Sequence, residues 1–285
     1  MDVRPSPIAG RWYPAQPDAL RASVDAFLAA AAAPAGPAVA GGDVIGLLAP
    51  HAGHLYSGAV AAHAFRAVQG AQVDVVALIC PSHYHDDGPV LTSGHAAYAT
   101  PLGAVVVDQE AVARLRALLA QALNLAPERA LVAIRDDQEH AIEIELPFLQ
   151  RSLAPGFKLL PVMLRDQDPA LAEALGAALA AGLRGRKALL VASSDLSHFY
   201  PQAQAVELDS EMLRRVAAFD PAGVLEAVES GAGLACGSGA IAAVMWAARA
   251  LGANRAEVLK QATSGDVSGD YGQVVGYAAA RLWKN

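Results

Sequence analysis

Cysteine is scarce in this sequence of 285 residues, which contains only Cys80 and Cys236. Small secreted domains without a large core depend on several disulfides, and two cysteines cannot supply such a framework in a chain of this length. The first residues also lack the apolar stretch of a secretory signal peptide, because prolines and arginines interrupt them. We therefore expect a reducing, cytoplasmic location.

Runs of basic residues are absent, and the net charge is −7. Proteins that bind nucleic acid usually carry clustered lysine and arginine, so we expect no nucleic-acid partner. The two most apolar long stretches, residues 27–39 and 231–253, are rich in alanine and glycine and are interrupted by proline or arginine. Neither is typical of a leucine-rich membrane span, and we expect no membrane segment.

Several common catalytic motifs are also missing. The sequence has no H-E-x-x-H, no C-x-x-C, no G-x-x-x-x-G-K-[ST] and no G-x-S-x-G. These absences exclude the usual zinc-protease, zinc-ribbon, P-loop and hydrolase-elbow classes. The glycine-rich residues 36–42 precede a predicted strand and lack the order G-x-G-x-x-G, so they are not a dinucleotide fingerprint.

The central feature of the sequence is the run V-I-G-L-L-A-P-H-A-G at residues 44–53. Its first residues are continuously apolar, which is typical of a strand buried on both faces of a sheet. Pro50 ends that strand, so His51 should lie just beyond its carboxyl end, where open α/β sheets bind their ligands. Taken alone, His51 could equally be a hydrogen-bonding residue of the turn.

Two further apolar runs deliver histidines in the same way. In residues 73–83 a strand ends at a proline and leads to His83, and in residues 188–198 a strand leads to Asp195 and His198. Neighbouring strands of one sheet lie about 5 Å apart. Side chains that leave the same edge can therefore converge on one ion or substrate.

The polar stretch at residues 136–153 starts with acids, as a helix N-terminus should. On a helix, His140 and Glu143 would share one face and could hold one ion or orient one another. The alternative is that Glu143 is solvated and His140 is hydrogen-bonded. His85 lies in a polar loop and would reach a metal only if that loop folded inward.

Cys236 lies in the glycine-bracketed turn A-C-G-S-G at the start of an expected helix. The helix field and any nearby cation would lower the pKa of its thiol toward the thiolate, which is a metal ligand. The alternative is a small buried hydrophobic residue, and this alternative is stronger for Cys80 at the end of an apolar strand. Two histidines and one anionic ligand leave coordination positions open, as non-haem Fe(II) requires to hold substrate and O2.

Seven motifs follow one another along nearly the entire chain. They are R-P-S-P-I-A-G-R-W-Y-P at residues 4–14, P-H-A-G-H-L-Y-S-G at 50–58, P-S-H at 81–83, Y-A-T-P-L-G at 98–103, E-H-A-I-E-I-E-L-P-F-L at 139–149, S-S-D-L-S-H at 193–198, and C-G at 236–237. Together they resemble the Memo family, whose bacterial members are also called AmmeMemoRadiSam system protein B. The number and order of the motifs make this resemblance specific.

The resemblance implies the fold of the class III extradiol ring-cleaving dioxygenases. This is an α/β fold in which a single domain over residues 1–285 forms a sandwich around a central mixed sheet. The resemblance also implies site residues, with His51, His83 and Cys236 as metal ligands, His198 as the acid/base residue, His140 near a substrate contact, and Asp195 in the same cleft.

The chain departs from the family pattern at His54 and Cys80, where tyrosine and glycine are usual, and these changes are expected to alter the shape of the pocket. At Cys236 the ring-cleaving dioxygenases have a carboxylate. A thiolate is softer than a carboxylate and shifts the metal preference from Fe(II) toward copper or zinc.

Three functions fit these residues. The first is an Fe(II)-dependent, dioxygenase-like oxidoreductase acting on a phenolic or catecholic small molecule, in which His198 moves the substrate proton. The second is a metal- or peptide-binding protein without turnover, since animal Memo proteins are implicated in signalling and in iron or copper handling. The third is a zinc-dependent hydrolase with His198 or Asp195 as the base. The resemblance also implies AMMECR-type and radical SAM system proteins as partners.

Overall fold

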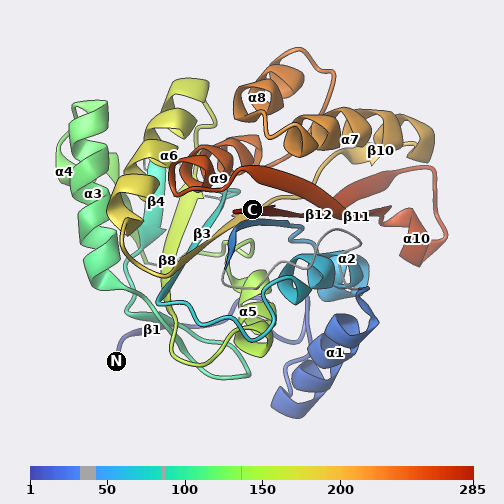
Figure 1. Cartoon of the computed structure of the whole chain (residues 1–285). Helices are drawn as coiled ribbons and strands as arrows, with labels where there is room; N and C mark the ends of the chain where they lie inside the picture. The colour runs from blue at the N-terminus through green and yellow to red at the C-terminus, as the bar shows by residue number, and fades with distance from the viewer. Residues whose placement is uncertain (33–42, 85–87, 136) are drawn as a thin grey trace.

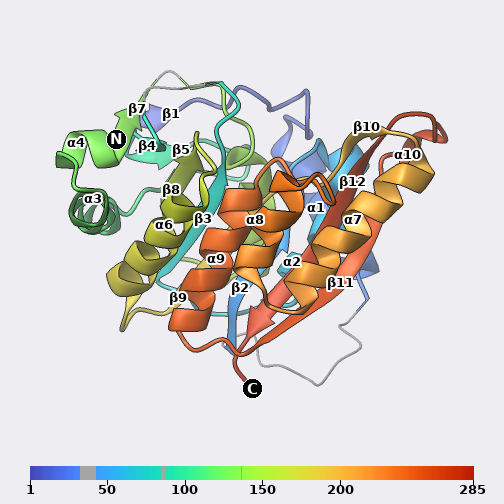
Figure 2. The same cartoon turned by 90° about the horizontal axis from the view of Figure 1, so that it is seen from above.

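A large mixed β-sheet forms the centre of the molecule, and helices cover both of its faces (Figures 1 and 2). The computed structural model describes residues 1–32, 43–84, 88–135 and 137–285. Within these residues the strands of the sheet are β2 (Val44–Ala49), β3 (Val75–Pro81), β4 (Val90–Ser93), β7 (Val132–Ile134), β8 (Lys158–Leu164), β9 (Ala188–Ser193), β10 (His198–Tyr200), β11 (Arg255–Thr263) and β12 (Val274–Trp283). Their order is β10-β12-β2-β9-β3-β8-β4-β7, with β11 paired to β12. The predicted α/β class and central mixed sheet are confirmed.

The helices form a layer on each side of this sheet (Figure 1). One layer contains α1 (Pro17–Ala30), α2 (His54–Arg66) and α5 (Leu146–Ser152), and the other contains α6 (Pro169–Leu183), α7 (Gln202–Ala217), α8 (Pro221–Glu229) and α9 (Ser238–Ala250). The remaining elements are α3 (Gln109–Leu123), α4 (Pro127–Ala130), α10 (Gly265–Ser268) and a small sheet of β1 (Val3–Arg4), β5 (Ala97–Tyr98) and β6 (Val105–Val106). Because both faces are covered, a central strand such as β3 is buried at every position, which explains its continuously apolar sequence.

The strands that carry the predicted histidines lie side by side at the centre of the sheet. Val191 of β9 pairs with Leu47 of β2 on one side and with Leu78 of β3 on the other, and both pairings are parallel. The carboxyl ends of β2, β9 and β3 therefore meet at one edge, as predicted. The succession of strand, helix and strand in the sequence predicts that β2 and β3 pair directly, but β9 lies between them.

The predicted helix over residues 136–153 is wrong in its first half. Residues 137–142 are irregular, and only the short 3-10 turn η2 (Glu143–Glu145) and α5 follow. The carboxylate of Glu139 accepts the backbone N–H groups of His140 at 2.9 Å and Ala141 at 3.0 Å, and such local bonds compete with helix formation. His140 and Glu143 consequently share no helical face, and Glu143 is buried rather than solvated.

The helix after His51 begins earlier than its sequence suggests. Serine is a preferred N-cap residue, so the sequence predicts a helix that is capped by Ser57. Instead, α2 begins at His54 with Gly53 at its N-cap, and the Ser57 hydroxyl donates to the carbonyl of Ala52 at 2.8 Å. The early start carries Leu55 and Tyr56 to the edge of the sheet where the histidines lie.

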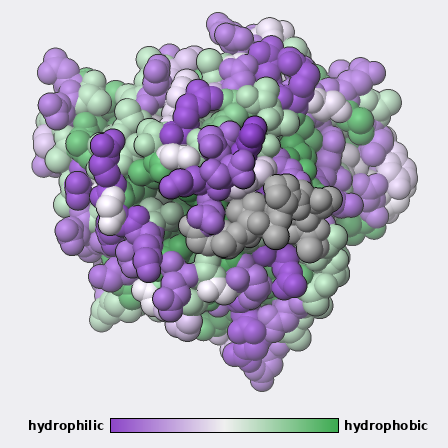
Figure 3. Space-filling model, viewed as in Figure 1, coloured by the Kyte–Doolittle hydropathy of each residue, from purple (hydrophilic) through white to green (hydrophobic). Residues whose placement is uncertain are grey.

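The surface seen in Figure 3 is mainly hydrophilic, with smaller apolar areas between the polar residues. In the part of the chain that the structure describes, no helix combines the length and hydropathy needed to cross a bilayer. His85 and the glycine-rich residues 36–42 lie outside the described residues.

Candidate metal centre

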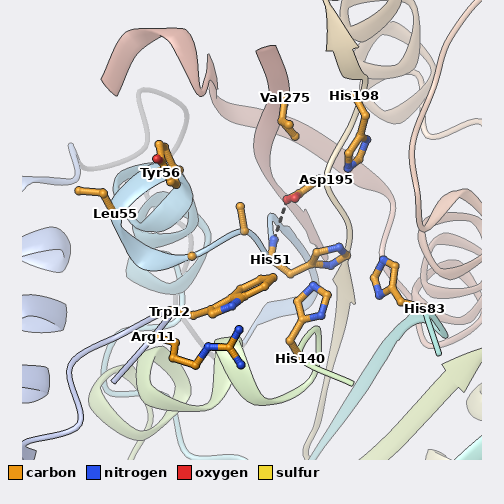
Figure 4. Close-up of a pocket in the computed structure, with 12 residues that line it drawn as sticks. Arg11, Trp12, His51, Leu55, Tyr56, His83, His140, Asp195, His198 and Val275 are labelled. Carbon is orange, nitrogen blue, oxygen red and sulfur yellow. Dashed lines mark hydrogen bonds between the residues drawn. The ribbon is translucent and has the colours of Figure 1, made fainter. Parts of the chain in front are cut away.

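A cavity of about 480 Å³ opens at the shared edge of β2, β9 and β3 (Figure 4). The described residues that line it include five of the six predicted site residues, namely His51, His83, His140, Asp195 and His198. His51, His83 and His140 each offer a ring nitrogen, and these nitrogens all lie within 4.8 Å of one another. The sequence predicted this convergence for His51 and His83, whereas it gave His140 an ion only together with Glu143, and the family resemblance placed His140 near a substrate contact.

His51 is buried, and its two ring nitrogens have different neighbours. Nδ1 lies 3.0 Å from Oγ of Ser193, whose own hydroxyl lies 2.7 Å from the carbonyl oxygen of Ala141. Because that carbonyl takes the hydroxyl hydrogen, Nδ1–H of His51 donates to Ser193, and Nε2 is left with a free lone pair. Burial lowers the pKa of His51 to about 3, so the ring is neutral, which is the form that binds metals.

His83 is held by the buried carboxylate of Glu139. One carboxylate oxygen lies 2.9 Å from Nδ1 of His83, and the other accepts the backbone N–H of the same residue at 2.7 Å. Burial opposes ionisation of Glu139, but the hydrogen bonds from His83 outweigh it and lower the pKa of the carboxyl to about 2. An ionised carboxylate only accepts, so Nδ1 of His83 carries the proton and Nε2 is the available donor to a metal.

His140 contributes a nitrogen that no other described group satisfies. Its Nδ1 is buried and has no hydrogen-bond partner within the described ranges. Burial, followed by the nearby His51, lowers the pKa of His140 to about 3, so this ring is also neutral. The indole of Trp12 lies against it with the ring centroids 4.2 Å apart. A neutral imidazole with an unsatisfied nitrogen can bind a cation. Without a ligand, a buried nitrogen that lacks a hydrogen-bond partner lowers the stability of the fold.

Cys236 lies in the turn before α9, with its Sγ atom 3.2 Å from Nε2 of His51. The side chain of Gln167 fixes this turn, since it donates to the carbonyl of Cys236 and accepts the N–H of Gly239 at 2.8 Å. Burial, followed by the charge of Asp195, raises the pKa of the thiol to about 12. The predicted lowering of this pKa is therefore wrong for the thiol without a cation, because burial and the charge of Asp195 both disfavour the thiolate.

Nearly the whole chain is similar to one protein family. A sequence model described as Memo-like protein matches residues 4–281. The chain belongs to the Memo family. A MEMO1 family protein of Methanopyrus kandleri is 37% identical over 287 residues, which cover 95% of this chain and 96% of that protein. Another, from Nitrosopumilus maritimus, is 31% identical over 98% of this chain and 99% of its own length. An uncharacterized protein of Escherichia coli K12 shows a remote likeness, with a TM-score of 0.43 and 13% identity over 73% of this chain and 86% of that one.

Asp195 and His198 line the same cavity in this Memo-family chain, and Asp195 lies next to the backbone of His51 (Figure 4). The buried carboxylate of Asp195 accepts the backbone N–H of His51 at 2.8 Å, and burial raises its pKa to about 6. Nδ1 of His198 lies 2.9 Å from the carbonyl of Leu196. A carbonyl only accepts, so Nδ1 is protonated and Nε2 of His198 is free to take a proton.

The two departures from the Memo pattern lie behind the cavity and are not among its described lining residues. His54 is buried against Phe148 with ring centroids 4.9 Å apart, and one of its ring nitrogens lies 3.0 Å from the carbonyl of Ile144. Cys80 is fully buried in β3. Their effect on the cavity is therefore indirect, through the packing beneath it.

Sequence reasoning missed Glu139 and Arg4. The buried Arg4 guanidinium donates to Asp137 at 2.6 Å, to Glu143 at 2.8 Å and to the carbonyl of Glu139 at 2.6 Å. It thereby anchors the irregular segment that carries Glu139 and His140. An acid directly before a candidate histidine was the available signal for Glu139. No periodicity marked Arg4, because its partners lie more than 130 residues away.

Proposed function

We propose that this Memo-family chain binds one divalent transition metal through His51, His83 and Cys236, and acts on a phenolic small molecule as a dioxygenase-like oxidoreductase. The observation that supports this most directly is the convergence of the neutral imidazoles of His51 and His140 with the imidazole of His83 beside a cavity, with the thiol of Cys236 next to His51. The outer nitrogens of His51 and His83 are each occupied by a side-chain oxygen, which leaves their inner nitrogens for the ion.

The separation of Cys236 and His51 agrees with shared coordination. Nitrogen and sulfur ligands with bonds of about 2.0 and 2.3 Å to a tetrahedral ion stand roughly 3.5 Å apart. The distance between Nε2 of His51 and Sγ of Cys236 is 3.2 Å. Among the proposed ligand atoms, the thiolate is the one that carries negative charge to balance a divalent ion, so we place Cys236 among the ligands and leave His140 as an additional donor or a substrate contact.

Iron(II) in this site would supply oxidative chemistry with O2, whereas the soft thiolate also suits copper or zinc. The protein's own contribution to turnover is proton transfer. His198 lines the cavity together with His83 and His140, and its Nε2 can accept a phenolic proton from a ligand bound there (Figure 4).

Metal handling without turnover is the second candidate, and the thiol of Cys236 favours it because ring-cleaving dioxygenases use a carboxylate at this position. Elemental analysis of anaerobically purified protein, followed by O2 uptake with a panel of catechols, separates the two. Oxygen uptake that depends on iron and on His198 supports the oxidoreductase, and full metal loading without uptake supports the second function. Zinc-dependent hydrolysis and the partnership with AMMECR-type and radical SAM proteins stay predictions of the family resemblance.

A further inference from the structure

Arg11 lies at the mouth of the cavity on a backbone that is fixed in place. The N–H of Arg11 donates to the carbonyl of Ile8 at 3.0 Å, and the neighbouring Trp12 binds both Ile8 and the N–H of His54 through its backbone. The Arg11 side chain is exposed, and its guanidinium lies beside the Trp12 ring and is directed toward His140 (Figure 4). Arg11 thus places a cation over the cavity from a backbone that hydrogen bonds fix in position.

No acidic partner for Arg11 is found among the described residues, although many other arginines have one. Arg151 binds Asp25 at 2.7 Å, and Arg135 binds Asp2 at 2.6 Å. The one acid among the described lining residues is Asp195, which is buried and already bonded to the backbone of His51. The cavity therefore offers a cation without supplying an anion to pair with it.

The walls of the cavity suit a flat ligand. Trp12 forms one wall together with His140, while Leu55 and Tyr56 project from α2 with exposed side chains. A volume of about 480 Å³ is within the range of small-molecule sites and is ample for a single substituted ring. No lysine and no second arginine occurs among the described lining residues, so a singly charged group is a better match than a phosphate, which usually gathers several donors.

We propose that Arg11 binds the carboxylate of an aromatic acid whose phenolic end reaches the histidine cluster. This inference rests on the proposed function and names its substrate class. The planar guanidinium matches a carboxylate with two parallel hydrogen bonds. Because Arg11 is exposed to solvent, its contribution to the affinity for the acid is modest and decreases with salt.

The test compares 3,4-dihydroxybenzoate with catechol by calorimetric titration of the zinc-loaded protein, in which no oxidation complicates binding. We expect the acid to bind about five- to tenfold more tightly than catechol in the wild type. Arg11→Met should abolish this preference while leaving catechol affinity and zinc content unchanged. Arg66→Met is the matched control, since it removes an exposed arginine from the far end of α2 and should keep the preference.

The outcomes separate this inference from the proposed function. Equal binding of the two compounds by the wild type, or a preference that survives Arg11→Met, overturns the role of Arg11 but leaves the phenolic site standing. Binding of neither compound by fully zinc-loaded protein contradicts both proposals. A preference that is lost in Arg11→Met, retained in Arg66→Met and reduced by 0.5 M NaCl supports the aromatic acid.

Discussion

The carboxylate of Glu139 lies 2.9 Å from Nδ1 of His83 and also accepts the backbone N–H of that residue at 2.7 Å. This double contact fixes both the tautomer and the position of a metal ligand whose side chain is 31% exposed. Through its carbonyl, Glu139 is in turn bound to the guanidinium of Arg4 at 2.6 Å. The first residues of the chain and the metal centre are therefore coupled by one series of hydrogen bonds.

Replacing Glu139 by glutamine should lower zinc affinity about 10- to 100-fold, because an amide no longer demands a proton on Nδ1 of His83. Competition with a chromophoric chelator measures the change. Glu143→Gln is the matched control, since this carboxylate lies in the same segment and is buried, but it binds Arg4 rather than a ligand. An equal loss of affinity in both variants would show that general disruption of the segment, rather than positioning of His83, is responsible.

Replacing Arg4 by methionine should lower the free energy of unfolding by about 3–5 kcal/mol, because Asp137 and Glu143 would remain buried without their cation. Urea denaturation measures this change. Arg21→Met serves as the comparison, since Arg21 pairs with Asp18 on an exposed helix surface and should cost less than 1 kcal/mol. A loss below 1 kcal/mol for Arg4→Met would contradict the structural role of the buried cluster.

Metal affinity should increase with pH between 7.5 and 9. Burial raises the pKa of the Cys236 thiol to about 12, so the thiol is protonated without metal and must lose its proton when the ion binds. A lower proton concentration therefore favours the metal-bound form, by roughly tenfold per pH unit for one released proton. Proton release into a weak buffer should be about one per zinc ion in the wild type. Release that is unchanged in Cys236→Ala would contradict a thiolate ligand.

Replacing His198 by alanine should leave the metal content near that of the wild type and lower any phenol-dependent turnover by about 10²–10⁴-fold, as expected for a lost acid/base group. His140→Ala should reduce turnover less. Metal content by elemental analysis and O2 uptake are measured on the same preparations. Loss of metal from His198→Ala at unchanged folding would assign His198 to the ligands.

The sheet edge was predictable because buried parallel strands have a simple sequence pattern. Continuous apolar residues that end at a proline identified the exits to His51 and His83, and β9 supplied the third exit. The segment before α5 was not predictable in this way. Acids at the start of an amphipathic pattern usually indicate a helix N-terminus, but the Glu139 carboxylate binds the backbone N–H groups of the next two residues instead.

Long-range polar contacts were beyond the reach of sequence patterns. A buried arginine at position 4 and its acidic partners leave no periodic pattern, since they lie more than 130 residues apart in the sequence. The thiol of Cys236 is a related case. Its position at a helix start was evident from the sequence. Its raised pKa was not, because the rise results from burial by the surrounding fold and from the charge of Asp195.

Cobalt(II) titration of matched cysteine variants tests the metal centre most directly, because a thiolate bound to cobalt gives a charge-transfer absorption that imidazole ligands do not. The wild type and Cys80→Ala should each bind one equivalent and show this absorption, since Cys80 is buried in β3 and lies outside the proposed ligand set. Cys236→Ala should remain folded, lose the absorption and bind cobalt much more weakly. Full stoichiometry in Cys236→Ala, together with no thiolate absorption in the wild type, would contradict the proposed ligand set and assign the ion to the histidines.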